Sequence, residues 1–273
     1  MVQNEVSRST IQKGKSALLR YTGLIWFSFA MIGQLIFVAF ILRFYGSSIA
    51  TGNFVAWNDR PLITGYVAGD FFGNLMFAIH MLLAVVITLG GLAQIIPYIR
   101  QRYTRFHRWN GRLFIITAYI MAFGGLWMTW GRGSHLSVIS AISVSLNGIL
   151  IIVFATLALR FAMKRRFDLH QQWAVSTFLV VNGVWFFRVA IMGWMLINQS
   201  PRWMNNTLSG AADIALSFGS YLVPLAAYYL YRFAKSRSSQ SLRIFTSIVI
   251  LLLTLFMIVG IVGATLFMWF PSS

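Results

Sequence analysis

Cysteine is absent from this 273-residue chain, and acidic residues are scarce. Without cysteine there is no disulfide, thiolate metal site, iron–sulfur cluster or cysteine nucleophile. The five acidic residues are Glu5, Asp59, Asp70, Asp168 and Asp213. None lies deep inside an apolar run, which argues against proton-coupled antiport and intramembrane aspartyl chemistry. The chain has no Walker-type phosphate loop and no His-Glu-x-x-His helix, and we identify no catalytic residue.

Polar residues of every kind are too few for a soluble domain of this size. Charged residues make up 10% of the chain, hydrophobic residues make up 58%, and mean hydropathy is +0.73. Apolar runs of about 20 residues, enough to cross roughly 30 Å of hydrocarbon, recur along the chain. They must be helical, because in lipid each backbone polar group is paired within its own segment. The predicted spans are residues 21–42, 72–96, 109–129, 138–163, 172–196, 212–231 and 244–270.

The predicted fold is therefore all-α, a polytopic membrane bundle of seven transmembrane helices over residues 21–270. Residues 1–20 form a basic, mostly polar tail that does not resemble a cleavable signal peptide. Residues 43–71 form the one long connection, an outer loop whose aromatic side chains suggest packing on the outer face.

The net charge of +17 follows this topology rather than indicating nucleic acid. Seventeen of the 22 basic residues fall at one side of the predicted bundle: Arg8, Lys13, Lys15, Arg20, Arg100, Arg102, Arg105, Arg108, Arg112, Arg160, Lys164, Arg165, Arg166, Arg232, Lys235, Arg237 and Arg243. The other side carries Arg43, Arg60, Arg132 and Arg202. The positive-inside rule then predicts a cytoplasmic N-terminus and an outer C-terminus, with anionic lipid headgroups as natural neighbours.

The four histidines fall one to each of four consecutive predicted spans. His80 and His135 lie toward the outer face, and His107 and His170 lie toward the cytoplasmic face. This alternation is what two bis-histidine sites, one per leaflet, require. Histidine in or near a bilayer is costly, so a functional role is the default hypothesis.

His107 and His170 have related surroundings. His107 lies in Arg105-Phe106-His107-Arg108-Trp109-Asn110-Gly111-Arg112, and His170 lies in Arg166-Phe167-Asp168-Leu169-His170-Gln171-Gln172-Trp173. Thr104 and Asp168 are predicted helix caps, which places each histidine in a first turn. There the helix dipole favours the neutral imidazole that ligates metal. Arg108 and Arg112 are candidates to neutralise an anion such as a haem propionate. The alternative is that both motifs are interfacial anchors.

Two resemblances follow from these residues. His80, Gly91-Leu92-Ala93-Gln94, the His-Arg-Trp-x-Gly-Arg motif, His170-x-x-Trp173 and Arg188 together resemble a family of multi-span bacterial membrane proteins of unknown function. This resemblance covers roughly residues 73–190 and implies an inner-membrane location, but no activity. His135 lies outside that pattern. The architecture also resembles transmembrane di-haem cytochromes of the ascorbate-reducible b type, which would pair His80 with His135 and His107 with His170 on haem b.

Arg188 and His80 are each predicted to lie about 12 Å from the outer ends of their spans. An arginine at that depth needs a partner. The sequence leaves an anionic cofactor or substrate, Asp213, or backbone carbonyls as candidates.

Our leading hypothesis is a haem-binding electron-transfer protein, with a membrane oxidoreductase subunit as one form of it. His107 and His170 would ligate an inner haem, and His80 and His135 an outer one. Arg188 would face the outer cofactor or a quinone, and a redox protein is another candidate partner. The alternative is a cofactor-free transport, lipid-interacting or signalling protein with a polar site at His80 and Arg188.

Overall fold

The computed structural model describes the backbone of residues 2–59 and 65–271, and the side chains of residues 17–59 and 65–271. The side chains of Arg8, Lys13, Lys15 and Arg60 lie outside the described residues, as do residues 60–64 of the predicted outer loop. Helices account for all regular structure in the described ranges. The α-helices are α1 (Val2–Ile41), α2 (Ser47–Thr51), α3 (Phe71–Ile95), α4 (Pro97–Arg102), α5 (Thr104–Trp130), α6 (Val138–Met163), α7 (Phe167–Val181), α8 (Gly183–Asn198), α9 (Ala211–Ser236) and α10 (Gln240–Gly263).

The helices have the lengths and composition of a polytopic membrane bundle. Six are long and apolar enough to cross a bilayer, and the α7–α8 pair makes a seventh span if its two halves cross together. Large apolar side chains such as Leu24, Ile116, Val153 and Leu252 are exposed along these helices. Apolar surface of this extent suits contact with lipid rather than water. The predicted all-α membrane bundle is confirmed.

Two predicted segments differ from the structure. The fifth span is not one straight helix, because α7 and α8 meet at Asn182 with a bend of 52°. The first helix also continues past its predicted end at residue 42. A π-helical turn, Leu42–Gly46, leads directly into α2, so the irregular part of the outer connection begins only at Gly52. Helical backbone there keeps its polar groups paired, which a loop near the membrane would not.

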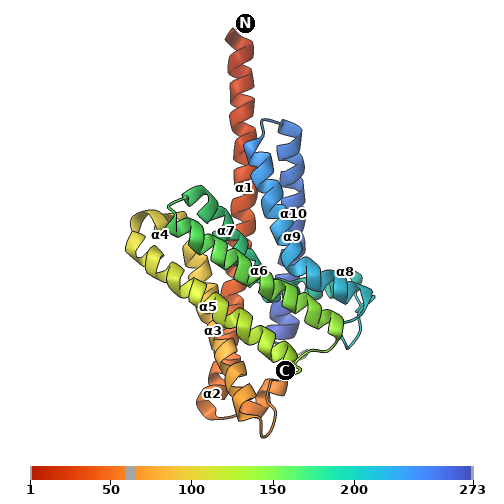
Figure 1. Cartoon of the computed structure of the whole chain (residues 1–273). Coiled ribbons are helices and arrows are strands. Elements are labelled where there is room, and N and C mark those ends of the chain that lie inside the picture. The colour runs from red at the N-terminus through yellow and green to blue at the C-terminus, as the bar shows by residue number, and fades with distance from the viewer. Residues whose placement is uncertain (1, 60–64, 272–273) are drawn as a thin grey trace.

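Figure 1 shows two groups of helices. One contains α1, α9 and α10, which run side by side, with α1 packed extensively on α10. The other contains α3, α5, α6 and α7, in which α5 packs on both α3 and α6, and α6 on α7. α8 joins the groups by packing on α9 and α10. The larger core cluster contains buried side chains of α1, α8 and α10, among them Phe37, Trp185 and Ile261, together with side chains of α3 and α7.

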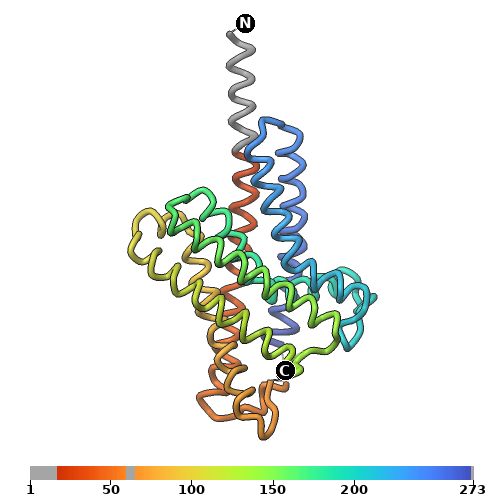
Figure 2. The backbone as a smooth tube through the Cα atoms, in the orientation of Figure 1, coloured from red at the N-terminus to blue at the C-terminus, as the bar shows by residue number. Residues whose placement is uncertain are grey.

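The basic segments gather at one end of the molecule. We define the basic end as the end carrying α4, the α6–α7 turn (residues 164–166) and the α9–α10 turn (residues 237–239). In Figure 2 these lie above the connections of the opposite end, which are residues 131–137, residues 199–210 and the C-terminal turn. The gathering of basic segments at one end agrees with the charge difference between the two sides of the bundle that the sequence predicts.

The opposite end is held together by Arg132, which follows α5. Its Nε lies 2.8 Å from Oδ2 of Asp70, the N-cap residue of α3, and Nη2 donates to Oδ1 of Asn74 at 2.8 Å. Asp70 also accepts from the backbone N–H of Gly73 at 2.8 Å. These contacts hold the start of α3 beside the end of α5. Both helices line the cavity described below.

The orientation in the membrane can be tested by cysteine labelling, since the chain has no cysteine of its own. Ser238→Cys marks the basic end and Ser200→Cys the opposite end, and both serines are exposed. By the positive-inside rule, we expect a membrane-impermeant maleimide to label Ser200→Cys on intact cells, and Ser238→Cys only after lysis. The cysteine-free parent is the control, and the reverse pattern would contradict this orientation.

Candidate functional site

The four histidines lie in two pairs, one toward each end of the bundle. His80 is in α3, ten residues after its N-cap Asp70, and His135 is in the connection between α5 and α6. His107 and His170 are near the starts of α5 and α7, at the basic end. All four side chains are half-buried. Each histidine therefore lies toward the end of the bundle that the alternation of spans predicts.

His80 and His135 line a single cavity of about 370 Å³. It lies among α1, α3, α5, α6, α8 and α9, in the size range of small-molecule sites. The ring of His80 faces Gly125 of α5, where a Cβ would lie 3.8 Å from its Cε1. Gly125 thus leaves room beside His80, whereas Gly91, whose Cβ would meet Phe178 at 2.9 Å, serves close helix packing.

The His135 ring is held in one tautomer. Its Nδ1 lies 2.8 Å from the carbonyl oxygen of Thr129, and its ring packs against Trp130 with centroids 5.6 Å apart. Because a carbonyl oxygen can only accept, Nδ1 donates and Nε2 keeps its lone pair. This is the arrangement of a metal-ligating histidine, in which the second nitrogen is fixed by a backbone carbonyl.

Arg188 lies in the same cavity, in the second turn of α8. Its Cζ is 5.7 Å from the ring centroid of Phe37, and Nη1 donates to the carbonyl of Val184 at 3.4 Å. It also interacts electrostatically with His80 and with Tyr45. The predicted proximity of Arg188 and His80 is therefore present in the structure.

No carboxylate neutralises Arg188 among the described residues, whose one ion pair joins Arg132 to Asp70. Asp213, one of the partners that the sequence left open, has another role. Its Oδ2 accepts from the backbone N–H groups of Gly210 and Asn205, at 3.1 and 2.8 Å, at the start of α9. Of the candidate partners within the chain, a backbone carbonyl is the one that Arg188 contacts.

Two buried asparagines, which the sequence reasoning missed, complete the polar wall of this cavity. Asn182 stands at the α7–α8 bend, where its Nδ2 donates to the carbonyl of Phe178 at 2.8 Å. Asn147 of α6 packs against Gly183, and its Oδ1 has no hydrogen-bond partner among the described residues. The signal was available, because each asparagine precedes a glycine inside an otherwise apolar span. Polar residues at such positions mark functional sites or packing contacts.

At the basic end, His107 and His170 occupy equivalent positions. Each is the fourth residue of its helix, and its N–H donates to the carbonyl of the N-cap residue, Tyr103 or Arg166, at 2.9 Å. The two rings interact electrostatically with each other, and His107 also with Arg100. Nδ1 of His170 lies 2.9 Å from the carbonyl oxygen of Ala158, whereas the buried Nδ1 of His107 has no partner among the described residues.

The predicted caps of these helices are wrong, although the first-turn placement of the histidines holds approximately. Thr104 and Asp168 lie inside the helices, and the N-cap side chains make no capping bond. α4 and α5 are separated by Tyr103 alone, which leaves no position for Thr104 outside the helix. Before α7, Arg165 turns the chain with a φ of 55°, so that the helix starts at Phe167.

The His-Arg-Trp-x-Gly-Arg motif contributes mainly to the crossing of α3 and α5. Asn110 Nδ2 donates to the carbonyl of Gly90 at 2.8 Å, and Gln94 Nε2 donates to the carbonyl of His107 at 3.0 Å. These bonds fix the position of His107 against α3.

Arg108 and Arg112 are exposed, and the Cζ of Arg112 lies 4.8 Å from the ring centroid of the exposed Trp109. This placement is typical of interfacial anchors. Neither His107 nor His170 lines the 370 Å³ cavity. The described residues contain no group of three or more histidine and carboxylate side chains arranged to hold a metal ion.

Residues 77–223 match the model of a family described as a predicted membrane protein, DUF2306. The match covers more than half of the chain. The protein belongs to this family. No curated protein and no solved structure matches the chain. The DUF2306 region contains all four histidines, Arg188 and both cavity asparagines, and it ends within α9. The description of the family names no activity.

Replacing Arg188 tests whether the cavity holds a charge that costs stability. We expect Arg188→Met to stabilise the purified protein by up to about 3 kcal/mol, because a cation without a carboxylate partner is costly at a transmembrane position. Thermal unfolding in detergent measures the difference. Arg202→Met is the control, since Arg202 is exposed over Trp203. A marked loss of stability in Arg188→Met alone would show that the arginine is compensated within the fold.

Proposed function

We propose that this protein is a haem-binding electron-transfer protein of the bacterial inner membrane, with its N-terminus in the cytoplasm. The observation that carries the proposal is the pairing of the four histidines, two toward each end of one bundle. A haem iron takes four ligands from the macrocycle, so a six-coordinate site needs only two histidines from the protein. The absence of a larger cluster of ligands in the described part of the chain is compatible with such a site.

The cavity lined by His80 and His135, which is the outer one in the proposed orientation, has the chemistry to hold a flat, anionic group. His80 and His135 would hold it, and His135 has its Nε2 free for coordination because its Nδ1 bonds to Thr129. Gly125 supplies space next to His80. Arg188 would neutralise a propionate of the bound group, because no carboxylate among the described residues pairs with it. The unpartnered Oδ1 of Asn147 would accept a hydrogen bond from water at the site.

The inner pair fits a second group less completely. His170 would coordinate through Nε2, since its Nδ1 bonds to Ala158, and His107 has a buried nitrogen that a ligand or water would satisfy. Arg100 is the basic side chain that interacts with His107, and it replaces Arg108 and Arg112 as the candidate for a propionate.

Haem, when bound, supplies reversible one-electron chemistry. The protein's part would be to hold one redox centre near each membrane face, to exclude water with the surrounding apolar helices, and to balance charge with Arg188 and Arg100. Two centres at opposite ends suit the passage of single electrons across the membrane. A membrane quinone or a redox protein is the class of partner that would exchange electrons at either face.

Visible spectroscopy tests the proposal directly. We expect protein expressed with added haem precursor to bind two haems per chain and to show b-type absorption bands that sharpen on reduction with dithionite. His80→Ala or His135→Ala should remove the outer haem, and His107→Ala or His170→Ala the inner one, each leaving a haem-to-protein ratio of about one. A colourless preparation would sink the proposal.

The two adjacent glycines of α5 provide a matched pair for the outer site. A Cβ at Gly125 would lie 3.8 Å from Cε1 of His80, whereas a Cβ at Gly124 would have no atom within 4 Å. We therefore expect Gly125→Leu to lose the outer haem while Gly124→Leu keeps both, as measured by the haem-to-protein ratio. Equal ratios for the two variants would place the outer haem elsewhere.

A further inference from the structure

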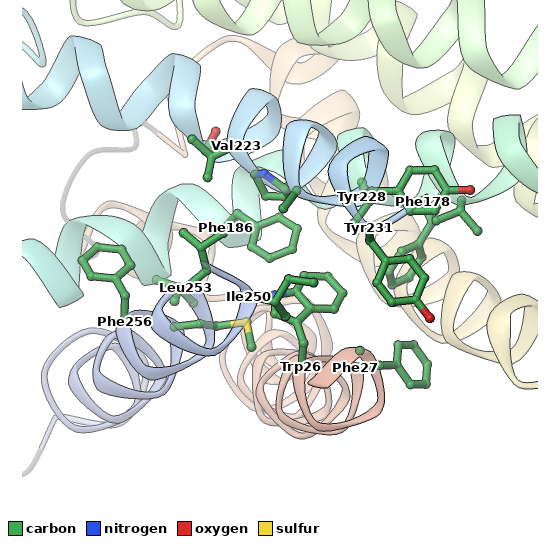
Figure 3. A pocket seen from close by; sticks show the side chains of 18 of the residues that line it. Trp26, Phe27, Phe178, Phe186, Val223, Tyr228, Tyr231, Ile250, Leu253 and Phe256 are labelled. Carbon is green, nitrogen blue, oxygen red and sulfur yellow. The ribbon is translucent and has the colours of Figure 1, made fainter. Parts of the chain in front are cut away.

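A second cavity of about 560 Å³ lies between α1, α7, α8, α9 and α10, toward the basic end. Figure 3 shows Trp26 of α1, Phe186 of α8 and Ile250 of α10 converging on it, with Tyr228 and Tyr231 of α9 along one side. Its wall is almost wholly apolar, and His80, His135 and Arg188 are not part of it. It is therefore distinct from the histidine-lined cavity.

Cationic and hydroxyl groups mark the end of this cavity that lies nearest the basic end. Arg20 of α1 lines the cavity and interacts electrostatically with Tyr231. Tyr228 also lines the cavity, and Arg232 stands next to it without lining the cavity itself: Nη1 of Arg232 donates to the Tyr228 hydroxyl at 3.2 Å, and its Cζ is 5.8 Å from that ring. Two arginine–tyrosine pairs thus stand where the apolar wall reaches the level expected for headgroups.

The cavity is continuous with the lipid-facing surface of the bundle. Leu24 and Val223 both line it, and they are 49% and 45% exposed. An amphiphile would therefore enter sideways from the bilayer, without passing through water.

We propose that this cavity binds an anionic phospholipid, with one acyl chain between α1, α9 and α10 and the phosphate at Arg20 and Arg232. The apolar wall matches the chain, the two guanidinium groups match the anion, and the side opening matches supply from the membrane. Basic pockets between transmembrane helices at the cytoplasmic side are suited to anionic headgroups. A free anion would gain nothing from the apolar wall, and a neutral lipid would gain nothing from the arginines.

The test compares lipids on the purified full-length protein. Phosphatidylglycerol, phosphatidylcholine of the same chains and a decyl quinone are titrated separately, with thermal unfolding and native mass spectrometry as readouts. We expect phosphatidylglycerol to bind and stabilise most, and Arg20→Gln and Arg232→Gln each to weaken it about fivefold, since one basic residue is worth about 1 kcal/mol against an anionic lipid. Arg237→Gln should bind unchanged, because Arg237 is at the same end but neither it nor Phe233, the ring that it covers, lines the cavity.

Gly219→Leu tests the chain-binding part separately. Gly219 lines the cavity, and a Cβ there meets only Val223 at 3.7 Å, so a larger side chain fills the space. It should abolish binding, with Gly124→Leu as the control. Equal binding of phosphatidylcholine, or loss of affinity in Arg237→Gln as large as in Arg20→Gln, would overturn the proposal, as would tighter binding of the quinone. If Gly219→Leu does not fold, the arginine variants decide the outcome alone.

Discussion

The bend at Asn182 is the feature on which both cavities depend. A helix interrupted inside a bilayer exposes backbone groups that lipid cannot satisfy. Here the Asn182 side chain donates to the Phe178 carbonyl, and the N–H of Phe186 reaches the Asn182 carbonyl at 2.9 Å, so hydrogen bonding continues across the bend. Gly183 lets Asn147 of α6 approach, because a Cβ there would lie 2.8 Å from its amide nitrogen. The bend turns α8 against α9 and α10, with Phe186 on the apolar cavity and Arg188 on the histidine-lined one.

The contrast between Arg132 and Arg188 explains why the histidine-lined cavity is the better functional candidate. Arg132 stands at a helix end, is paired with Asp70 and bonds to Asn74, so its charge contributes to the fold. Arg188 stands within a span and has an aromatic ring and a backbone carbonyl as its contacts. A cation at that level costs a few kcal/mol in insertion measurements. If Arg188 served only to pack the helices together, an apolar side chain would do so without this cost.

The sequence predicted the spans, and the end of the bundle at which each histidine lies, because both depend on local properties. The fourth span, residues 138–163, coincides with α6, and the predicted start of the second is within one residue of Phe71. The end at which each histidine lies follows from counting helix crossings. The bend was missed because a hydropathy average over about 19 residues does not register two small polar residues between apolar neighbours. The cavity at His80 and His135 was also beyond prediction, because it depends on how α6 and α8 are rotated about their axes, which no local pattern specifies.

The charge distribution shows why net charge alone says little about partners here. Arg112, Arg237 and Arg20 lie over the rings of Trp109, Phe233 and Tyr21 at the basic end. Guanidinium groups on exposed aromatic rings are stable at a lipid–water interface, where the ring is held by the apolar region and the charge by headgroups. Most of the excess charge therefore follows from crossing a membrane in one orientation. The information about ligands lies in the cations that line a cavity, which among the described residues are Arg188 at the histidines and Arg20, itself exposed, at the mouth of the apolar cavity.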